Sequence, residues 1–343
     1  MNFWQELKAQ KNGEPILVLA PMADVTDPAF RRIIAKYGKP DVMWTEFVSA
    51  DGLFLGGREA LIKDLAYDES ERPIVAQFFT SSPERMMQAG MLAVELGFDG
   101  LDINMGCPDK SIEKQGAGAG LIKNPTLAKE LIRSAKEGIR VASLKKNIPE
   151  DKHIPVSVKT RIGYNKNELE TWLPALLDSE PAVVTIHART RKEMSLVPAR
   201  WEHVARAVEI RDSWRGADGQ KSQTLIFGNG DVLNIADAEK KATETHCDGV
   251  MLGRAIFGNP WCFSREVSRD DISIPDRLRV MVEHTKLFEE LLPHKSFAIM
   301  KKHYKAYVNG WDGAKELRMK LMEAKDASEI ELIISEYFKN GSV

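Results

Sequence analysis

Short apolar runs alternate with longer amphipathic segments along the first three quarters of the chain. Most of these runs are apolar almost throughout, which is typical of parallel strands that are buried on both faces. The pattern therefore predicts eight strands, at residues 16–20, 42–47, 74–79, 100–104, 155–159, 182–187, 224–228 and 249–252.

The segments between most of these runs are predicted to be helices. Three of them begin with a capping residue followed by proline, at Asp27-Pro28, Ser82-Pro83 and Asn124-Pro125. The stretch between the second and third runs is glycine-rich and less clearly helical. Alternation of strands and helices implies βα units, and eight units within about 250 residues favour a TIM barrel over an open sheet. We predict an α/β protein in which residues 1–262 form a (β/α)₈ barrel.

After Pro260 the strand-like runs disappear and helical periodicity takes over. Phe297, Met300, Tyr304 and Tyr307, for example, follow one another at spacings of three, four and three residues. We predict a small all-helical domain over residues 263–343, with helices at 275–292, 296–309, 313–324 and 327–338. The polar segment 211–223 is expected to be a loop insertion on the helix side of the barrel.

Composition and charge limit the classes of function. Hydrophobic residues make up 43% of the 343 residues, enough to bury a sizeable core. The formal net charge of -2 excludes a global polycation, so any nucleic-acid contact must come from a local basic patch. The three cysteines include no CxxC pair, which argues against a disulfide framework and favours a reducing compartment.

The sequence also predicts where the protein resides. The first fifteen residues contain no long apolar segment and no small-residue cleavage site, and no stretch approaches the roughly 20 apolar residues that cross a bilayer. We expect a soluble cytoplasmic protein that has no membrane partner. A monomer is the default expectation.

Glycine and arginine follow the last two predicted strands. The seventh strand ends in Gly228-Asn229-Gly230-Asp231, and the eighth ends in Gly253-Arg254. In TIM barrels the loops after strands seven and eight often bind a phosphate, because glycine lets backbone N–H groups approach the oxygens and arginine adds a bidentate contact. We therefore predict a phosphate site here, although the glycines alone are equally compatible with tight turns.

Three polar side chains near other strand ends should converge on the same pocket. Gln77, Lys159 and His187 lie at or near the ends of strands three, five and six. An amide can pair with the edge of a flavin ring, and a cation near its N1 and O2 atoms stabilises the reduced anion. The alternatives are a solvated lysine and a structural histidine, and it is the constellation that favours a flavin site.

Cys107 is the candidate catalytic residue. It lies between Gly106 and Pro108, ahead of the glycine-rich stretch 116–120. An unperturbed thiol has a pKa of about 8.5, so it is mostly protonated at neutral pH and can deliver a proton. Cys247 and Cys262 are predicted to be small buried hydrophobic residues. No His/Cys/Asp spacing indicates a metal site.

These motifs resemble those of the tRNA-dihydrouridine synthases. The resemblance rests on APMADVTDPAFRRI, NMGCP followed by GAGAGLI, VKTRIG, IHARTR, GNGDV and LGRAIFGNPW, and it continues more weakly into the helical segment. It implies FMN as cofactor, NADPH as reductant, and reduction of the C5–C6 double bond of a uridine in tRNA. It also implies that Cys107 is the proton donor, with Asn104 beside it, and that the FMN contacts are Pro21, Met22, Ala23, Gln77, Lys159, His187, Asn229, Gly230, Asp231, Gly253 and Arg254.

A tRNA partner needs basic residues outside the pocket. Between Lys295 and Lys320 the chain carries seven basic and two acidic residues, and Tyr304 and Tyr307 lie among them. A solvated helix face explains this composition equally well, and only the resemblance favours RNA binding. Beside the pocket, two arginines are candidates for a phosphate near the target base, or for pairing with carboxylates such as Glu193. The predicted tRNA contacts are Arg189, Arg191, Lys301, Lys302, Lys305 and Arg318.

Two alternative functions remain open at the level of sequence. The first is an FMN-barrel oxidoreductase that acts on a free small molecule, similar to dihydroorotate dehydrogenase, but such a substrate gives no reason for a basic helical segment. The second is a tRNA-binding module without catalysis. Cys107, Lys159 and His187 argue against it, because none of them is needed merely to bind RNA.

Overall fold

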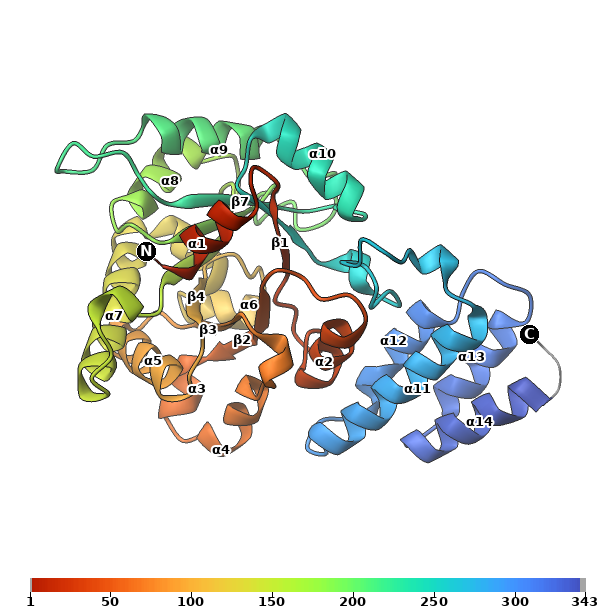
Figure 1. Cartoon of the computed structure of the whole chain (residues 1–343). Helices are drawn as coiled ribbons and strands as arrows, with labels where there is room; N and C mark the ends of the chain where they lie inside the picture. The colour runs from red at the N-terminus through yellow and green to blue at the C-terminus, as the bar shows by residue number, and fades with distance from the viewer. Residues whose placement is uncertain (1, 340–343) are drawn as a thin grey trace.

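The computed structural model describes residues 2–339 and contains a closed parallel barrel (Figure 1). Its strands lie in the order β1-β8-β7-β6-β5-β4-β3-β2, and a parallel bridge between Val18 and Val42 joins β1 to β2. Each strand overlaps one of the predicted runs, and the TIM-barrel prediction is confirmed. The strands are β1 (Ile16–Leu19), β2 (Met43–Ser49), β3 (Ile74–Phe79), β4 (Gly100–Asn104), β5 (Val156–Arg161), β6 (Val183–His187), β7 (Leu225–Asn229) and β8 (Gly249–Leu252).

The helices of the barrel begin where the sequence predicts them. Asp27, Ser82 and Asn124 each accept a hydrogen bond from a backbone N–H three residues further on. The glycine-rich stretch between β2 and β3 forms only short helical pieces, as expected. The helices are α2 (Pro28–Tyr37), α3 (Ala50–Phe54), α4 (Arg58–Leu61), α5 (Pro83–Glu95), α6 (Lys110–Lys114), α7 (Pro125–Lys145), α8 (Leu169–Leu177), α9 (Glu202–Ser213) and α10 (Ile235–Thr245).

The interior of the barrel changes from apolar to polar along the strands. Near their amino ends, inward-facing residues such as Val75 and Leu225 form an apolar cluster. Trp4 of α1 (Phe3–Gln10) joins this cluster and packs against Phe227 at 5.5 Å between ring centroids. Because side chains alternate along a strand, residues two positions further on face the same interior. The polar strand-end residues therefore stand on an apolar base.

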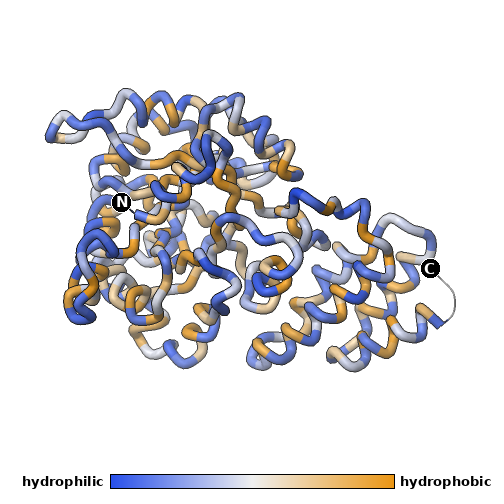
Figure 2. The backbone as a smooth tube through the Cα atoms, in the orientation of Figure 1, coloured by the Kyte–Doolittle hydropathy of each residue, from blue (hydrophilic) through white to orange (hydrophobic). Residues whose placement is uncertain are grey.

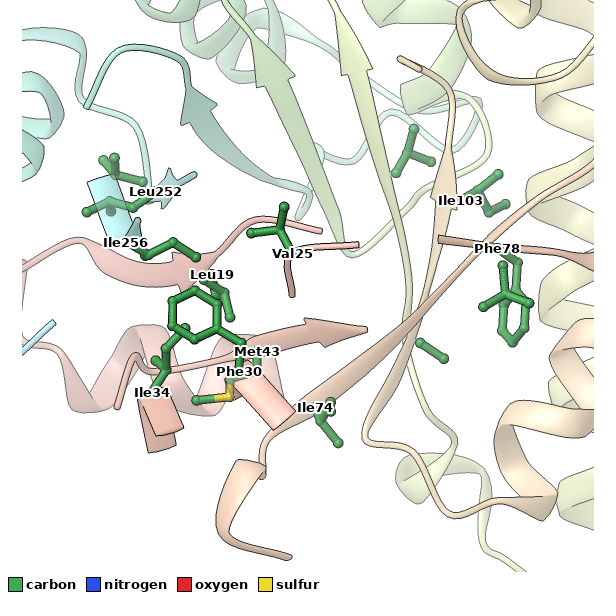
Figure 3. Close-up of a cluster of buried hydrophobic side chains, with 14 of the residues drawn as sticks. Leu19, Val25, Phe30, Ile34, Met43, Ile74, Phe78, Ile103, Leu252 and Ile256 are labelled. Atoms are coloured by element: carbon green, nitrogen blue, oxygen red, sulfur yellow. The ribbon is translucent and has the colours of Figure 1, made fainter. Parts of the chain in front are cut away.

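A second apolar layer lies between the strands and the surrounding helices. Leu19 of β1 and Met43 of β2 point outward and meet Phe30 and Ile34 of α2 (Figure 3). Figure 2 shows the corresponding hydropathy pattern over residues 2–339, in which the strands are mostly hydrophobic and hydrophobic and hydrophilic residues alternate along the helices. This layer holds the helices against the strands.

All four predicted C-terminal helices are present. They are α11 (Ile274–Leu291), α12 (Met300–Tyr307), α13 (Ala314–Glu323) and α14 (Ala327–Lys339), and α11 and α12 lie beside α2 (Figure 1). Phe30 of α2 packs against His284 of α11 and His303 of α12, at 4.7 and 4.8 Å between ring centroids. The hydrophobic cluster is thus continuous from the barrel into these helices. A domain boundary at residues 262–263 stays a prediction.

One lysine of the helical segment is inserted among barrel carboxylates. Lys295, between α11 and α12, lies 2.9 Å from Glu46 of β2 and 3.0 Å from Asp64, and its side chain is 12% exposed. Burial opposes the charged ammonium, but these carboxylates outweigh burial and raise the pKa of Lys295. Glu46 also accepts the backbone N–H of Asp24, at 2.5 Å, in the loop after β1.

The polar segment 211–223 continues α9 and then forms a loop before β7. An antiparallel bridge between Arg215 and Lys221 holds this loop together. It borders a groove of about 890 Å³ at the amino ends of β5, β6 and β7. None of the predicted site residues lines this groove, so it is not the candidate site. Among residues 2–339, no helix is both long and apolar enough to span a membrane.

We predict that Lys295→Met lowers the free energy of unfolding by about 3–5 kcal/mol at pH 7.5, because it leaves buried carboxylates without their cation. Urea unfolding followed by circular dichroism measures this change. Lys305→Met, at an exposed position of α12, is the control and should change the free energy by less than about 0.5 kcal/mol. Equal effects of the two substitutions would contradict the structural role of Lys295.

Candidate active site

A cavity of about 310 Å³ opens at the carboxyl ends of β1, β5, β6, β7 and β8. This is the face on which TIM barrels carry their active sites. The cavity brings together nine of the predicted cofactor residues, namely Pro21, Met22, Lys159, His187, Asn229, Gly230, Asp231, Gly253 and Arg254. Ala23, Gln77, Asn104 and Cys107 are not among the residues that line it.

The turn after β7 requires glycine. Gly230 has a φ of +122°, and a Cβ there would lie 2.8 Å from the Cβ of Ala199 and 3.1 Å from the ring of His187. Such a contact is too short, and the backbone conformation disfavours other residues. Gly230 therefore lies in a turn that requires glycine. It is also compatible with a phosphate, because the same absence of a side chain leaves the backbone of Gly230 open to the cavity.

Asp231 holds two arginines at the same turn. Its carboxylate accepts hydrogen bonds from Arg189 and Arg254, and from the backbone N–H of Ala199 at 2.8 Å. Burial opposes its charge, but the hydrogen bond from Arg189 and the other contacts outweigh burial and lower the pKa of Asp231. A carboxylate repels a phosphate, so the contribution of Asp231 to an anion site is to orient the arginines.

The cavity is strongly electropositive. Of the residues that line it, Lys159, Arg161, Arg189 and Arg254 carry positive charge, and the only carboxylate is that of Asp231. Burial, with a further contribution from Arg161, lowers the pKa of Lys159 to about 8. Removing cations from water without an equal number of anions is unfavourable. The cavity therefore suits an anionic ligand.

His187 is uncharged in this environment. Burial, followed by the fields of Lys159 and the neighbouring arginines, lowers its pKa well below the ordinary value. Arg189 Nη1 lies 3.2 Å from His187 Nε2. A guanidinium only donates, so Nε2 accepts and the ring proton belongs on Nδ1. His187 can therefore donate one hydrogen bond from Nδ1 without bringing another charge.

Cys107 is half-buried in the loop that follows β4. Its carbonyl accepts the backbone N–H of Ala119 at 2.9 Å, and a Cβ on Gly118 would lie 2.8 Å from the same carbonyl oxygen. Phe47 and Phe79 pack beside it. Burial raises the pKa of the Cys107 thiol, so the group is protonated at neutral pH. Cys247 and Cys262 are buried, as predicted.

Gln77 and Asn104 lie beneath this loop and not at the cavity wall. Both are buried, and the Asn104 amide nitrogen donates to Gln77 Oε1 at 3.1 Å. Asn104 Oδ1 accepts the backbone N–H of Cys107 at 2.9 Å. Asn104 is thus placed beside Cys107, as expected. The flavin contact predicted for Gln77 stays a prediction.

Sequence reasoning missed several residues of the site. Arg161 lines the cavity, and its Nε donates to the carbonyl of Gly106 at 2.7 Å, directly before Cys107. A charged residue at the end of the apolar strand β5 is the signal that could have identified it. Phe47 follows a register shift in β2, and alternation along the strand alone gave no reason to place it beside Cys107.

The two arginines proposed for RNA are engaged with protein groups. Arg189 is 3% exposed and donates to the carbonyl of Val197 at 2.6 Å as well as to Asp231. This placement does not suit a contact with an RNA backbone outside the cavity. Arg191 pairs with Glu113 of α6 at 2.6 Å, and Glu193 pairs instead with Arg200. Pairing with carboxylates, the alternative reading, describes both arginines.

The remaining RNA candidates lie on the helical segment. Lys301, Lys302 and Lys305 are on α12, where Lys305 is exposed and the other two are half-buried. Burial lowers the pKa of Lys302. Arg318 of α13 donates to the carbonyl of Val308 at 2.6 Å. Lys295, which contributes to the basic character of this stretch, is held by Glu46 and is not available to RNA.

Fold and site together define the class of protein: a (β/α)₈-barrel enzyme with an electropositive cavity and a protonated thiol at its carboxyl-terminal face. The sequence model of the dihydrouridine synthase family matches residues 18–340. A relative from Bacillus subtilis, described as a probable tRNA-dihydrouridine synthase 2, is 37% identical over 98% of this chain and 96% of its own length. A Staphylococcus aureus relative, described as a probable tRNA-dihydrouridine synthase, is 35% identical over 98% and 95%.

The chain belongs to the dihydrouridine synthase family. It is therefore an enzyme, a flavin-dependent oxidoreductase, and the alternatives of a dihydroorotate dehydrogenase-like enzyme and a non-catalytic module are set aside. Among solved structures, histamine dehydrogenase from Rhizobium sp. 4-9 is similar with a TM-score of 0.50 at 10% identity, covering 79% of this chain and 49% of that one. This likeness concerns the barrel fold alone. Within residues 2–339, no group of His, Cys, Asp and Glu is arranged to hold a metal ion.

We predict that alkylation of Cys107 by iodoacetamide accelerates about tenfold per pH unit from pH 7 to 9 without reaching a plateau, because only the thiolate reacts and burial raises the pKa. Mass spectrometry of the peptide that contains Cys107 gives the rate. The same peptide in urea-unfolded protein is the control, and the increase of its rate with pH should slow above about pH 8.5, where half of an unperturbed thiol is ionised. A plateau at or below pH 8 in the folded protein would show that the thiol is not protonated as described.

Proposed function

We propose that this chain is a tRNA-dihydrouridine synthase that reduces the C5–C6 double bond of specific uridines in tRNA, with FMN as cofactor and NADPH as reductant. The observation that carries the proposal is a protonated, half-buried thiol beside an electropositive cavity. The names of the similar proteins from B. subtilis and S. aureus support it. The proposed location is the cytoplasm, and the proposed form is a monomer.

The cavity residues fit FMN. Arg254 and the open backbone at Gly230 are the groups that would hold its phosphate, and Asp231 keeps the arginines in position. Lys159 would lie against the pyrimidine edge of the ring, where a cation is favourable. Pro21, Met22 and Ala23 belong to the loop after β1 at the same mouth. When bound, FMN in its reduced form supplies the hydride for C6 of uracil, and NADPH returns the flavin to that reduced form.

Cys107 completes the reduction at C5, the other carbon of the double bond. Hydride addition at C6 places negative charge on C5 and O4, and a thiol over C5 can quench that charge by protonation. Lys159 and Arg161 act on the thiol with fields that favour its ionised form. They therefore stabilise the thiolate that remains after the proton has left. Burial keeps the thiol protonated until that step.

The neutral state of His187 fits the same scheme. Its Nδ1–H can donate to a carbonyl or ring nitrogen, and the histidine adds no proton that could compete with that of Cys107. Lys159, with a pKa of about 8, is mainly charged at neutral pH and supplies the cation. In this scheme Cys107 gives the proton, and the other polar and charged groups of the cavity orient the ligand and neutralise its charge.

The base must leave the folded tRNA to reach this cavity. Flipping it out costs a few kcal/mol, and contacts with the phosphate backbone must offset that cost. We propose that the helical segment 263–343 supplies these contacts through Lys301, Lys302, Lys305 and Arg318. Its contact with α2 and the insertion of Lys295 fix it beside the active face.

We predict that Cys107→Ala retains FMN and tRNA binding but loses turnover by about 10²–10⁴-fold, the usual contribution of a general acid. Dihydrouridine is measured by mass spectrometry of tRNA incubated with protein, FMN and NADPH. Cys247→Ala, at the amino end of β8, is the control and should retain turnover. Wild-type turnover in Cys107→Ala would remove the assigned role.

A second prediction concerns RNA binding. The triple substitution of Lys301, Lys302 and Lys305 by Gln should weaken tRNA binding and flatten its dependence on log salt by about one unit for each phosphate contact that is lost. Filter binding between 50 and 300 mM KCl measures both quantities.

The matched control replaces three exposed lysines elsewhere on the barrel, Lys145, Lys221 and Lys240, by Gln. The change in net charge is the same, so a general effect of charge appears in both variants. If both triple variants lose affinity equally, the helical segment does not carry the RNA contacts proposed for it.

A further inference from the structure

A chain of buried side chains connects the barrel interior to the loop of Cys107. Asp102 of β4 accepts hydrogen bonds from Ser157 Oγ at 2.5 Å and from Gln77 Nε2 at 2.6 Å. Gln77 Oε1 in turn accepts from Asn104 Nδ2 at 3.1 Å. Asn104 Oδ1 accepts the backbone N–H groups of Gly106 at 3.1 Å and Cys107 at 2.9 Å.

Strand register places these groups in two adjacent levels. Gln77, Asp102 and Ser157 are neighbours on β3, β4 and β5. Asn104 lies two residues beyond Asp102 on the same face of β4, next to Lys159. The carboxylate is therefore one level below the candidate cavity, where it can reach neither a ligand in the cavity nor the thiol directly.

The Asp102 carboxylate fixes the order of donors and acceptors along this chain of hydrogen bonds. An ionised carboxylate only accepts hydrogen bonds, whereas an amide can present either its oxygen or its nitrogen. Asp102 therefore requires the Gln77 amide to present its nitrogen, which leaves the Gln77 oxygen facing Asn104. Asn104 must then present its nitrogen to Gln77 and its oxygen to the backbone. One acceptor thus fixes the orientation of two amides in succession.

The last link determines how the loop of Cys107 is held. With its oxygen toward the loop, Asn104 binds two consecutive N–H groups, and the opposite orientation would set donors against donors. On its other side, the loop is held by Arg161, whose Nε donates to the Gly106 carbonyl at 2.7 Å. Side chains therefore satisfy both the N–H and the carbonyl of Gly106, the residue before Cys107.

A buried carboxylate at this position needs a reason. Apolar residues such as Val75 and Val183 fill the neighbouring interior, and an apolar side chain would avoid the desolvation of a charge. Burial raises the pKa of Asp102 to about 6, although the hydrogen bonds from Ser157 and Gln77 oppose this, so the group is mainly ionised at neutral pH. What the carboxylate provides is an acceptor that cannot be reversed.

We propose that Asp102 is a positioning residue that fixes the orientation of the Gln77 and Asn104 amides and thereby holds the backbone of Cys107 in place. The inference rests on the proposed role of Cys107 as proton donor for its functional meaning. The positioning itself concerns hydrogen bonds within this protein and does not depend on that role. It is tested by the reactivity of the thiol in protein without cofactor.

The experiment removes the fixed direction of the hydrogen-bond chain and then restores it. Asp102→Asn replaces the acceptor-only carboxylate with an amide that can present either its oxygen or its nitrogen, so Gln77 and Asn104 lose their defined orientation and the loop is released. Alkylation of Cys107 at pH 8 should then be at least about fivefold faster than in the wild type, because a released thiol is less buried. Asn104→Ala removes the last link and should give the same direction of change.

In the double variant Asp102→Asn with Gln77→Glu, the amide and the carboxylate exchange places. The new asparagine donates to the new glutamate and accepts from Ser157, and the glutamate still accepts from Asn104, so every hydrogen bond is kept. Alkylation should return to within about twofold of the wild-type rate. A role of residue 102 in packing alone predicts no such rescue.

Ser157→Ala is the matched control, because it removes the other donor to Asp102 but lies outside the chain that leads to Cys107. Its alkylation rate should stay within about twofold of the wild type, and thermal unfolding of every variant separates release of the loop from unfolding. The proposal is overturned if the double variant reacts as fast as Asp102→Asn, or if Asn104→Ala reacts at the wild-type rate. Turnover in Cys107→Ala, by contrast, bears only on the proposed function.

Discussion

The alternation of side chains inside a closed parallel barrel is the constraint on which the rest of this structure depends. Every second residue of each strand must face the interior, and the strands run in the same direction. The amino halves contribute apolar residues that pack around Trp4, and the carboxyl halves contribute Gln77, Lys159, His187 and Asn229. This packed apolar base excludes water from the amino-terminal half of the barrel interior. Electrostatic interactions among the charged groups at the mouth are stronger as a result.

Electrostatics then determines which chemistry the mouth supports. Cations outnumber carboxylates there, so the cavity favours an anion and a thiolate is stabilised once it forms. Burial, reinforced by these cations, keeps the imidazole of His187 neutral. Burial acts on Cys107 in the opposite sense and keeps the proton on sulfur beforehand. Proton delivery needs both effects, because a thiol that ionised too easily would have no proton left to give.

Local patterns gave the strands, the capped helices and most of the cavity lining, because alternation, capping and glycine turns act over a few residues. They could not give partners that are distant in sequence. Lys295 appeared to belong to an RNA-binding surface, but it is paired with Glu46, 249 positions away. For Arg189 the sequence left phosphate binding and carboxylate pairing open, and its partner Asp231 lies 42 positions away. The helix around Trp4 was missed because eight residues with one buried aromatic side chain give little periodicity.

The position of Glu46 has a mechanical consequence. This one carboxylate binds Lys295 of the helical segment and the backbone N–H of Asp24 in the loop that begins at Pro21. A displacement of the helical segment at Lys295 is therefore passed through Glu46 to the loop after β1, in addition to the packing of Phe30 against His284 and His303. The position of these helices and the shape of the cavity rim are thus mechanically coupled.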